Sequence, residues 1–159
     1  MKQVGKLTIT TPSDCELSMT RVFNAPRHLV WEAYTKPELV KRWLGAMGGW
    51  TMPVCEIDVR VGGKFRYLWK SSEGHTMGMS GVYLEILPNE RIVNTEKFDE
   101  AWYEGEARET VVLTEKDGKT TLVSTVRYGS KEIRDMVLAS PMESGVAASY
   151  DALEVLLAK

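Results

Sequence analysis

The sequence contains few residues of the kinds that build metal or disulfide sites. Cys15 and Cys55 are the only cysteines, and His28 and His75 the only histidines, among 159 residues. Two cysteines this far apart make no disulfide framework, and free thiols are typical of the reducing cytoplasm. Without clustered cysteine or histidine, we expect no metal site and no cofactor. We also expect the protein to be cytoplasmic.

Long apolar stretches and an excess of one charge are also missing. The N-terminal residues lack the apolar stretch of about 7 to 15 residues found in a signal peptide. No run approaches the roughly 20 apolar residues that span a bilayer. Lys and Arg number 20 against 22 Asp and Glu, which gives a formal charge of −2. We therefore expect neither nucleic-acid binding nor membrane insertion.

Motifs of several common enzyme classes are absent too. The sequence contains no nucleophile elbow, no P-loop and no Rossmann glycine pattern. No catalytic residue can be assigned on this basis, and we expect binding rather than catalysis.

The composition is that of one folded domain. Hydrophobic residues make up 43% and charged residues 26%, which is close to the average for globular proteins. A chain of this length buries about 70% of its unfolded surface. We therefore expect a single domain over residues 1–159 with a substantial core.

Strand-like and helix-like patterns follow one another along the chain. Glu16–Asn24 alternates between apolar and polar residues and predicts a strand, with a shorter one at Lys6–Thr10. Pro26 suits the first turn of a helix, and the capping pattern Thr35-Lys-Pro-Glu38 predicts a second short helix. Six further strands are predicted over Val54–Val61, Lys64–Lys70, Thr76–Leu87, Arg91–Phe98, Gly105–Glu115 and Thr120–Gly129.

Turn and capping signals complete this outline. Asp117-Gly118 predicts a tight hairpin between the last two strands. Ser130 is a candidate cap for a short helix, and Ser140-Pro-Met-Glu143 predicts the start of a long helix that ends near Leu157. The predicted fold class is α+β: an antiparallel sheet, two short helices after the first strand, and a long C-terminal helix.

A strongly twisted sheet wrapped around one helix is hard to fill completely, so we expect a cavity between them. Methionine and aromatic side chains suit such a lining because they adapt to irregular shapes and are mostly apolar. They could also simply fill the core. The lining candidates are Trp43, Trp50, Met52, Trp69, Met77, Met79, Phe98, Trp102 and Tyr103.

A few polar residues are candidates for contacts with a ligand. Arg66 and Arg108 could hold a ligand carboxylate through paired hydrogen bonds. His75 is the better of the two histidines for acid–base work, although a histidine beside a turn is usually exposed. A charged stretch near the expected cavity mouth is interpreted by default as a solvated face; it contains Glu104, Glu106, Arg108 and Glu109.

Several collinear segments resemble a known family. They are Thr20–Glu38, Trp43-Leu-Gly45, Asp58–Gly63, Gly81–Pro88 and Met142–Leu157. Together they cover roughly residues 16–158, nearly the whole chain. They resemble the family named for the activator of the 90-kDa heat-shock protein ATPase, which belongs to the START-like, or SRPBCC, superfamily.

The resemblance implies the helix-grip fold of the birch-pollen-allergen type, with a hydrophobic cavity under the C-terminal helix. Relatives in the superfamily bind lipids, sterols, hormones and polyketides, and some are cyclases. The family offers no shared catalytic residue. Its most recognisable motif includes Asp58, Arg60, Gly62 and Gly63 here, and we interpret these residues as a structural turn with a charge pair.

Three functions therefore compete. The first is binding of a small hydrophobic ligand. The second is an enzyme, such as a cyclase, hydrolase or isomerase, which requires His75, Glu104 and Arg108 to point into one cavity. The third is a chaperone-interacting stress-response module, which requires an exposed apolar patch. The chain has no room for the co-chaperone's N-terminal chaperone-binding domain, so we expect no chaperone contact; nothing requires or excludes a homodimer.

Overall fold

One antiparallel sheet of nine strands dominates the computed structural model, which describes residues 2–44, 49–100 and 103–158. The strands are β1 (Lys2–Val4), β2 (Leu7–Ser13), β3 (Glu16–Phe23), β4 (Trp50–Ile57), β5 (Lys64–Ser71), β6 (Thr76–Leu87), β7 (Arg91–Phe98), β8 (Ala107–Lys116) and β9 (Lys119–Arg127). Their order across the sheet is β1-β2-β3-β9-β8-β7-β6-β5-β4. The pairing of β3 with β9 therefore joins the N-terminal strands to the end of the meander.

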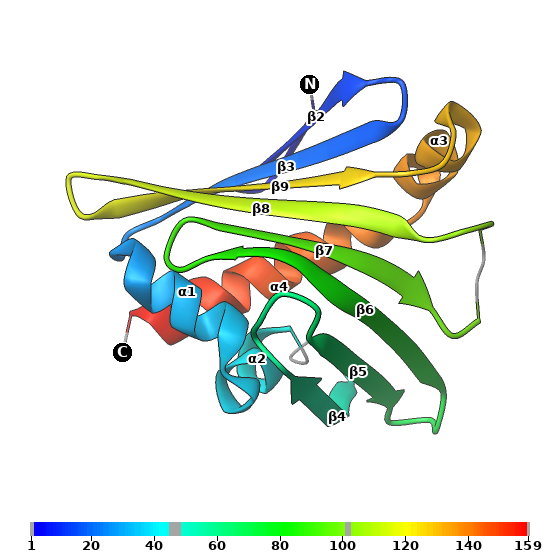
Figure 1. Ribbon diagram of the computed structural model, residues 1–159, viewed down its shortest axis with the longest axis horizontal. Coiled ribbons are helices and arrows are strands. Elements are labelled where there is room, and N and C mark those ends of the chain that lie inside the picture. The colour runs from blue at the N-terminus through cyan, green and yellow to red at the C-terminus, as the bar shows by residue number, and fades with distance from the viewer. Residues whose placement is uncertain (1, 45–48, 101–102, 159) are drawn as a thin grey trace.

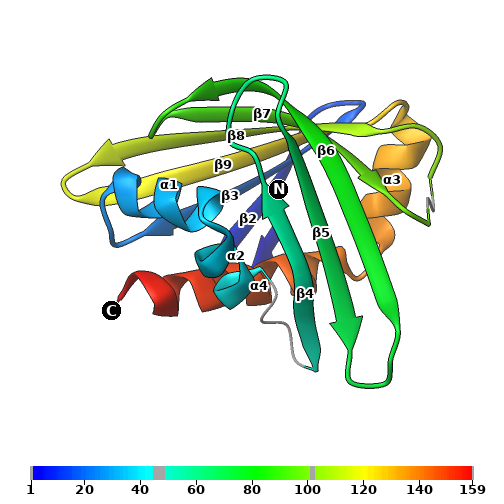
Figure 2. The ribbon, with the colours of Figure 1, turned by 60° about the horizontal axis from the view of Figure 1, so that its bottom comes forward.

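Four helices accompany this sheet in the described part of the chain. They are α1 (Arg27–Thr35), α2 (Pro37–Trp43), α3 (Lys131–Ala139) and α4 (Met142–Leu157). Figures 1 and 2 show the sheet curling over α4, with α1 and α2 near one end of α4 and α3 near the other. This is a helix-grip fold, as predicted. The two short helices follow the third strand rather than the first, because β1 and β2 precede them.

Alternation of side chains explains which face of the sheet meets α4. On β5, Phe65, Tyr67 and Trp69 are buried, whereas Lys64 and Lys70 are exposed. Successive residues of a strand point to opposite faces, so this pattern gives the sheet an apolar concave face and a polar convex face. The same alternation runs through β8 and β9.

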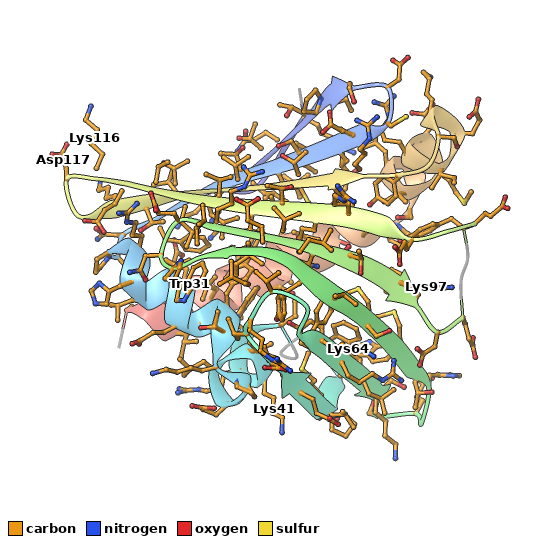
Figure 3. The ribbon with its side chains drawn as sticks, viewed as in Figure 1. Trp31, Lys41, Lys64, Lys97, Lys116 and Asp117 are labelled. Carbon is orange, nitrogen blue, oxygen red and sulfur yellow. The ribbon has the colours of Figure 1, made fainter. Side chains whose placement is uncertain are left out.

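The β8–β9 hairpin is built as its turn sequence predicts. Asp117 has φ 54° and Gly118 has φ 76°, and a type I′ turn requires positive φ at both central residues. Lys116 pairs with Lys119 across the turn. Lys116 and Asp117 mark the outer tip of this hairpin in Figure 3.

The segment after β4 corrects one predicted boundary. The predicted strand Val54–Val61 is β4 in the structure, which starts at Trp50 and ends at Ile57. Asp58–Gly63 forms a turn instead, in which Arg60 Nε donates to Asp58 Oδ2 at 2.7 Å. The structural interpretation of this motif is confirmed, with its charge pair in a turn rather than on a strand.

Serine side chains accept backbone hydrogen bonds at two of the three predicted capping sites, and the Thr35 site is the exception. Ser130 Oγ accepts a hydrogen bond from the Ile133 backbone N–H at the start of α3. Thr35 does not cap α2, because its hydroxyl donates to the Trp31 carbonyl oxygen within α1. The residue before α4 is Pro141, and Ser140 Oγ accepts a hydrogen bond of 3.4 Å from the Met142 backbone N–H at the start of that helix.

The core lies between the concave face and the helices in two adjoining clusters. The larger one joins β2, β3, β8 and β9 to α1 and α4, and includes Leu17, Leu122 and Leu153. The smaller one joins β4–β7 to α2, and includes Phe65, Trp69 and Met79. Partly buried Trp31, Tyr34 and Phe98 pack against both clusters. The two clusters therefore meet at these three side chains.

Gly81 on β6 is a position where only glycine fits. A methyl group there would overlap the Thr95 carbonyl oxygen and the Phe65 ring. We expect Gly81→Ala to lower the free energy of unfolding by about 1–3 kcal/mol, the usual cost of overpacking. Gly129→Ala is the matched control, because its new carbon would lie 3.8 Å from Ile133 Cδ1 in ordinary contact. Urea denaturation of both variants tests this; equal stability would contradict the close approach.

Candidate functional site

Aromatic rings from three helices and several strands meet between the sheet and α4. Trp43 lies at the end of α2, with its ring centroid 4.9 Å from that of Tyr34 and 6.0 Å from that of Tyr150. Its indole Nε1 donates to the Ala33 carbonyl oxygen at 2.8 Å. Phe23 of β3 packs edge-on against Tyr150 at 5.9 Å. These contacts hold α1, α2 and α4 together over the sheet.

Two glutamates face the same interior from neighbouring strands. Glu109 of β8 lies opposite Asn94 of β7, and Glu96 lies opposite Ala107. Glu109 shares its strand face with the buried residues Ala107 and Val111. The two carboxyl groups are within hydrogen-bonding reach of each other. We call Glu96 and Glu109 the carboxyl pair.

The carboxyl pair begins a chain of polar groups that reaches α4 and α1. Ser124 Oγ on β9 donates to Glu109 Oε2 at 2.7 Å. The Ser124 hydroxyl is also within hydrogen-bonding reach of Tyr150. The Tyr150 and Tyr34 hydroxyl oxygens are 3.1 Å apart. A series of neighbouring polar groups therefore runs from the sheet to the helices through the aromatic lining.

The surroundings of the carboxyl pair favour its protonated form. Burial raises the pKa of Glu96 well above its usual value, and the nearby charge of Glu109 raises that pKa further. Burial also raises the pKa of Glu109, although the hydrogen bond from Ser124 opposes this effect. Two like charges this close disfavour double ionisation, so the pair keeps a shared proton to a higher pH than a lone glutamate would.

Buried tyrosines surround the carboxyl pair and stay uncharged. Burial raises the pKa of Tyr103 to about 12, and the Glu96 charge adds to this. Burial likewise raises the pKa of Tyr128, followed by the effect of Glu96. The Tyr103 and Tyr128 rings meet edge to face at 5.6 Å. Their hydroxyl groups are therefore neutral hydrogen-bonding groups close to an acidic pair.

Comparison with known proteins identifies the family of this chain. The family model for activator of Hsp90 ATPase homolog 1-like proteins matches residues 24–158. The chain belongs to this family. No curated protein matches the chain. Membership in the family points to a ligand-binding or chaperone-associated module.

Solved structures of bacterial proteins share the fold. The chain is 35% identical to a protein of Rhodobacter sphaeroides, with a TM-score of 0.90; the match covers 96% of this chain and 98% of that one. A protein of Chromobacterium violaceum is 26% identical with a TM-score of 0.78, over 91% and 98% of the two chains. A Mycobacterium smegmatis protein, 21% identical over 96% and 98%, has the same fold with a TM-score of 0.84.

Most of the predicted lining residues of this family member lie in the interior. Those in the two core clusters, or packed against them, are Trp43, Trp50, Met52, Trp69, Met79, Phe98 and Tyr103. Met77 pairs with Trp69 and shares its face, but lies at the rim and is 38% exposed. Trp102 is outside the described residues.

The three polar candidates lie elsewhere, which corrects their expected place in the lining. Arg66 points to the outside of β5, where its guanidinium pairs with Asp99. His75 is exposed in the β5–β6 turn, 3.6 Å from Glu73. Arg108 is exposed because it alternates with the inward residues of β8. Glu104 is exposed as well, so the cluster of His75, Glu104 and Arg108 that the enzyme hypothesis required is not formed.

Glu109 corrects the interpretation of its neighbourhood as a solvated face. Glu104, Glu106 and Arg108 are exposed, whereas Glu109 turns inward. Residues 107–113 alternate, with Ala107, Val111 and Leu113 buried. This alternation was the signal in the sequence that could have identified Glu109, and the same argument applies to Glu96 between Asn94 and Phe98.

Two hollows lined by described residues lie outside this interior. One, of about 340 Å³, is on the convex face and includes Arg91, Arg108 and Arg127. The other, of about 330 Å³, is near the α3–α4 turn. Within the described ranges, no three His, Cys, Asp or Glu side chains gather in a way that could hold a metal ion. None of the described helices is long and apolar enough to cross a membrane.

Proposed function

We propose that this protein binds a small, largely apolar molecule between the concave face of the sheet and α4. The observation that carries the proposal is the carboxyl pair. The residues Glu96 and Glu109 keep part of their surface accessible, and largely buried tyrosines lie close to them. A ligand bound beside them would contact apolar rings over most of its surface and polar groups at one end. Small-molecule sites usually combine these two kinds of contact.

The packing of the core does not explain why two glutamates lie in the interior. Burying ionisable carboxyl groups costs free energy unless they are fully paired. Groups with strongly raised pKa values gather at functional sites, because binding and proton transfer use them. Met79 and Phe98 pair across β6 and β7 on the same concave face. Flexible side chains such as Met79 can make room for a guest.

The shared proton supports a second candidate, acid–base catalysis on the bound molecule. A carboxyl group with a raised pKa can donate or accept a proton near neutral pH. In this enzyme the acting groups would be Glu96 and Glu109, not the exposed His75. The proposal includes no chaperone, nucleic-acid or membrane partner and leaves the oligomeric state open. It places the protein in the cytoplasm, in keeping with the free thiols of Cys15 and Cys55.

Native mass spectrometry and thermal unfolding test the binding proposal. We expect gently purified protein to carry a small-molecule adduct, or an apolar compound to raise the melting temperature. At 100 times its Kd a ligand stabilises by about 2.7 kcal/mol, or roughly 5–11 °C for a protein of this size.

A pair of variants on β6 makes this test specific. Met79→Trp enlarges a buried side chain on the concave face, so we expect it to abolish the adduct and the ligand-induced shift. Leu84→Trp lies on the same strand, where Leu84 is 39% exposed, and should keep both. Circular dichroism confirms folding of each variant. Absence of any adduct and of any shift across a broad panel of apolar compounds would contradict the proposal.

A further inference from the structure

The carboxyl pair lacks a basic partner among the residues that the structure describes. The side chains that affect the ionisation of Glu96 and Glu109 are each other and Ser124. The fully buried cation Arg21 is engaged elsewhere: its Nη2 lies 2.9 Å from Asp151 Oδ1 and 3.6 Å from Glu154 Oε1. Any negative charge on the pair therefore has no counterion from the described chain.

The rings around the pair favour a positive guest as well. Tyr103 and Tyr128 approach Glu96 from the strand side, and Phe98 meets Tyr103 edge to face at 6.4 Å. Tyr150 approaches from the helix side, where its ring stacks against that of Trp43. The faces of aromatic rings carry negative potential and attract cations, most strongly where water is excluded. The carboxyl pair and the aromatic rings thus both favour a positively charged ligand.

Tyr128 adds an independent observation. Its side chain is 9% exposed. Tyr128 directly follows β9. It continues the alternation that places Ser124 and Val126 on the inward face. Within the described residues its hydroxyl forms no hydrogen bond, and it is not one of the fully enclosed unpaired polar atoms, so it keeps some accessible surface. The Tyr128 oxygen is therefore free to accept a hydrogen bond from a guest beside Glu96.

We propose that the guest carries a basic nitrogen, and that the protonated amine is held by Glu96 and Glu109 while its apolar part packs against the aromatic rings. This inference rests on the proposed binding function and names its ligand class. The ammonium group donates to the two carboxylates, with the Tyr128 hydroxyl as a further acceptor. As the cation binds, the proton shared by the pair is released to the solvent, which leaves both carboxylates ionised.

Matched pairs of probes test the inference. The probes are 2-phenylethylamine against 2-phenylethanol, and tryptamine against tryptophol, measured by isothermal titration calorimetry. We expect each amine to bind at least tenfold more tightly than its alcohol. We also expect the amine's binding enthalpy to change with the ionisation enthalpy of the buffer, because a proton is released. Glu96→Gln/Glu109→Gln should weaken amine binding at least tenfold and leave alcohol binding unchanged, whereas the exposed control Glu104→Gln should change neither.

Each other outcome has a distinct meaning. If alcohols bind as tightly as amines, or if amine binding survives in the double variant, the ligand class is wrong and the binding function stands. If neither series binds but another neutral apolar compound raises the melting temperature through a site blocked by Met79→Trp, the ligand class is again wrong. If no compound of any kind binds, both the inference and the proposed function fail.

Discussion

Leu153→Ala is expected to lower the free energy of unfolding by about 2–5 kcal/mol, the usual cost of truncating a buried leucine. Leu153 is 0% exposed and belongs to the larger core cluster. It lies three residues after Tyr150, so both side chains leave α4 on the side that faces the sheet. The truncation removes apolar contacts at the place where α4 is held against the strands, and the resulting cavity cannot be filled without moving the helix.

Val155→Ala on the same helix is the matched control for this prediction. Val155 is 59% exposed, so its truncation should change stability by no more than about 0.5 kcal/mol. Urea denaturation monitored by tryptophan fluorescence measures both variants. A loss below about 1 kcal/mol in Leu153→Ala, or equal losses in the two variants, would show that α4 does not pack on the sheet through this face.

The strand meander was predictable because its signals are local. Phe65, Tyr67 and Trp69 alternate with charged residues, and this period of two fits only a strand with one buried face. Asp117 and Gly118 are a pair that adopts positive φ readily, so their turn type followed from the sequence. Six strands in a row with short turns then leave an antiparallel sheet as the only simple arrangement.

Other features depended on which of several possible hydrogen-bond or strand partners a residue takes, and a sequence pattern does not show this. Thr35 matched a capping pattern, yet α1 continues to this residue and its hydroxyl bonds back to the Trp31 carbonyl oxygen instead. Lys2–Val4 is a three-residue strand, too short to give a periodic signal, and it exists because β2 offers it a partner. Asp58–Val61 continued the alternation of β4, but the Asp58–Arg60 ion pair and the turn at Gly62 end the strand first.

The sequence predicted the interior position of most apolar candidates, but it did not predict the position of the polar ones. Large apolar side chains such as Trp43 and Trp69 occur in the interior because any fold of this chain must bury them. The polar candidates were chosen by residue type, and this choice favoured Arg108 over its neighbour Glu109. Strand alternation places the two on opposite faces, and the inward one is the glutamate. Residue type suggests a chemistry, whereas register decides which residue can perform it.

Replacing the carboxyl pair by Glu96→Gln/Glu109→Gln is expected to stabilise the protein at pH 8 by on the order of 1–3 kcal/mol, the usual cost of a buried polar group without full pairing. Burial raises the pKa of both glutamates in the folded state. Between the ordinary glutamate pKa and the raised value, the folded protein therefore binds more protons than the unfolded chain. The contribution of this pair to the free energy of unfolding therefore falls as pH rises through that window.

At pH 5 the wild-type pair holds more of its protons than at pH 8, so the advantage of the glutamine variant should be smaller there. The surrounding tyrosines do not disturb this comparison, because burial raises the pKa of Tyr67, Tyr83 and Tyr150 and they stay neutral at pH 8. Asp99 has its pKa lowered by Arg66, so its stabilising effect is lost only at a pH below the window, and equally in both proteins. Urea denaturation at both pH values gives the result. If the glutamine variant gained the same free energy of unfolding at pH 5 and at pH 8, the pair would not change its protonation between these pH values. The hypothesis of a shared proton, on which the proposed ligand recognition depends, would then be wrong.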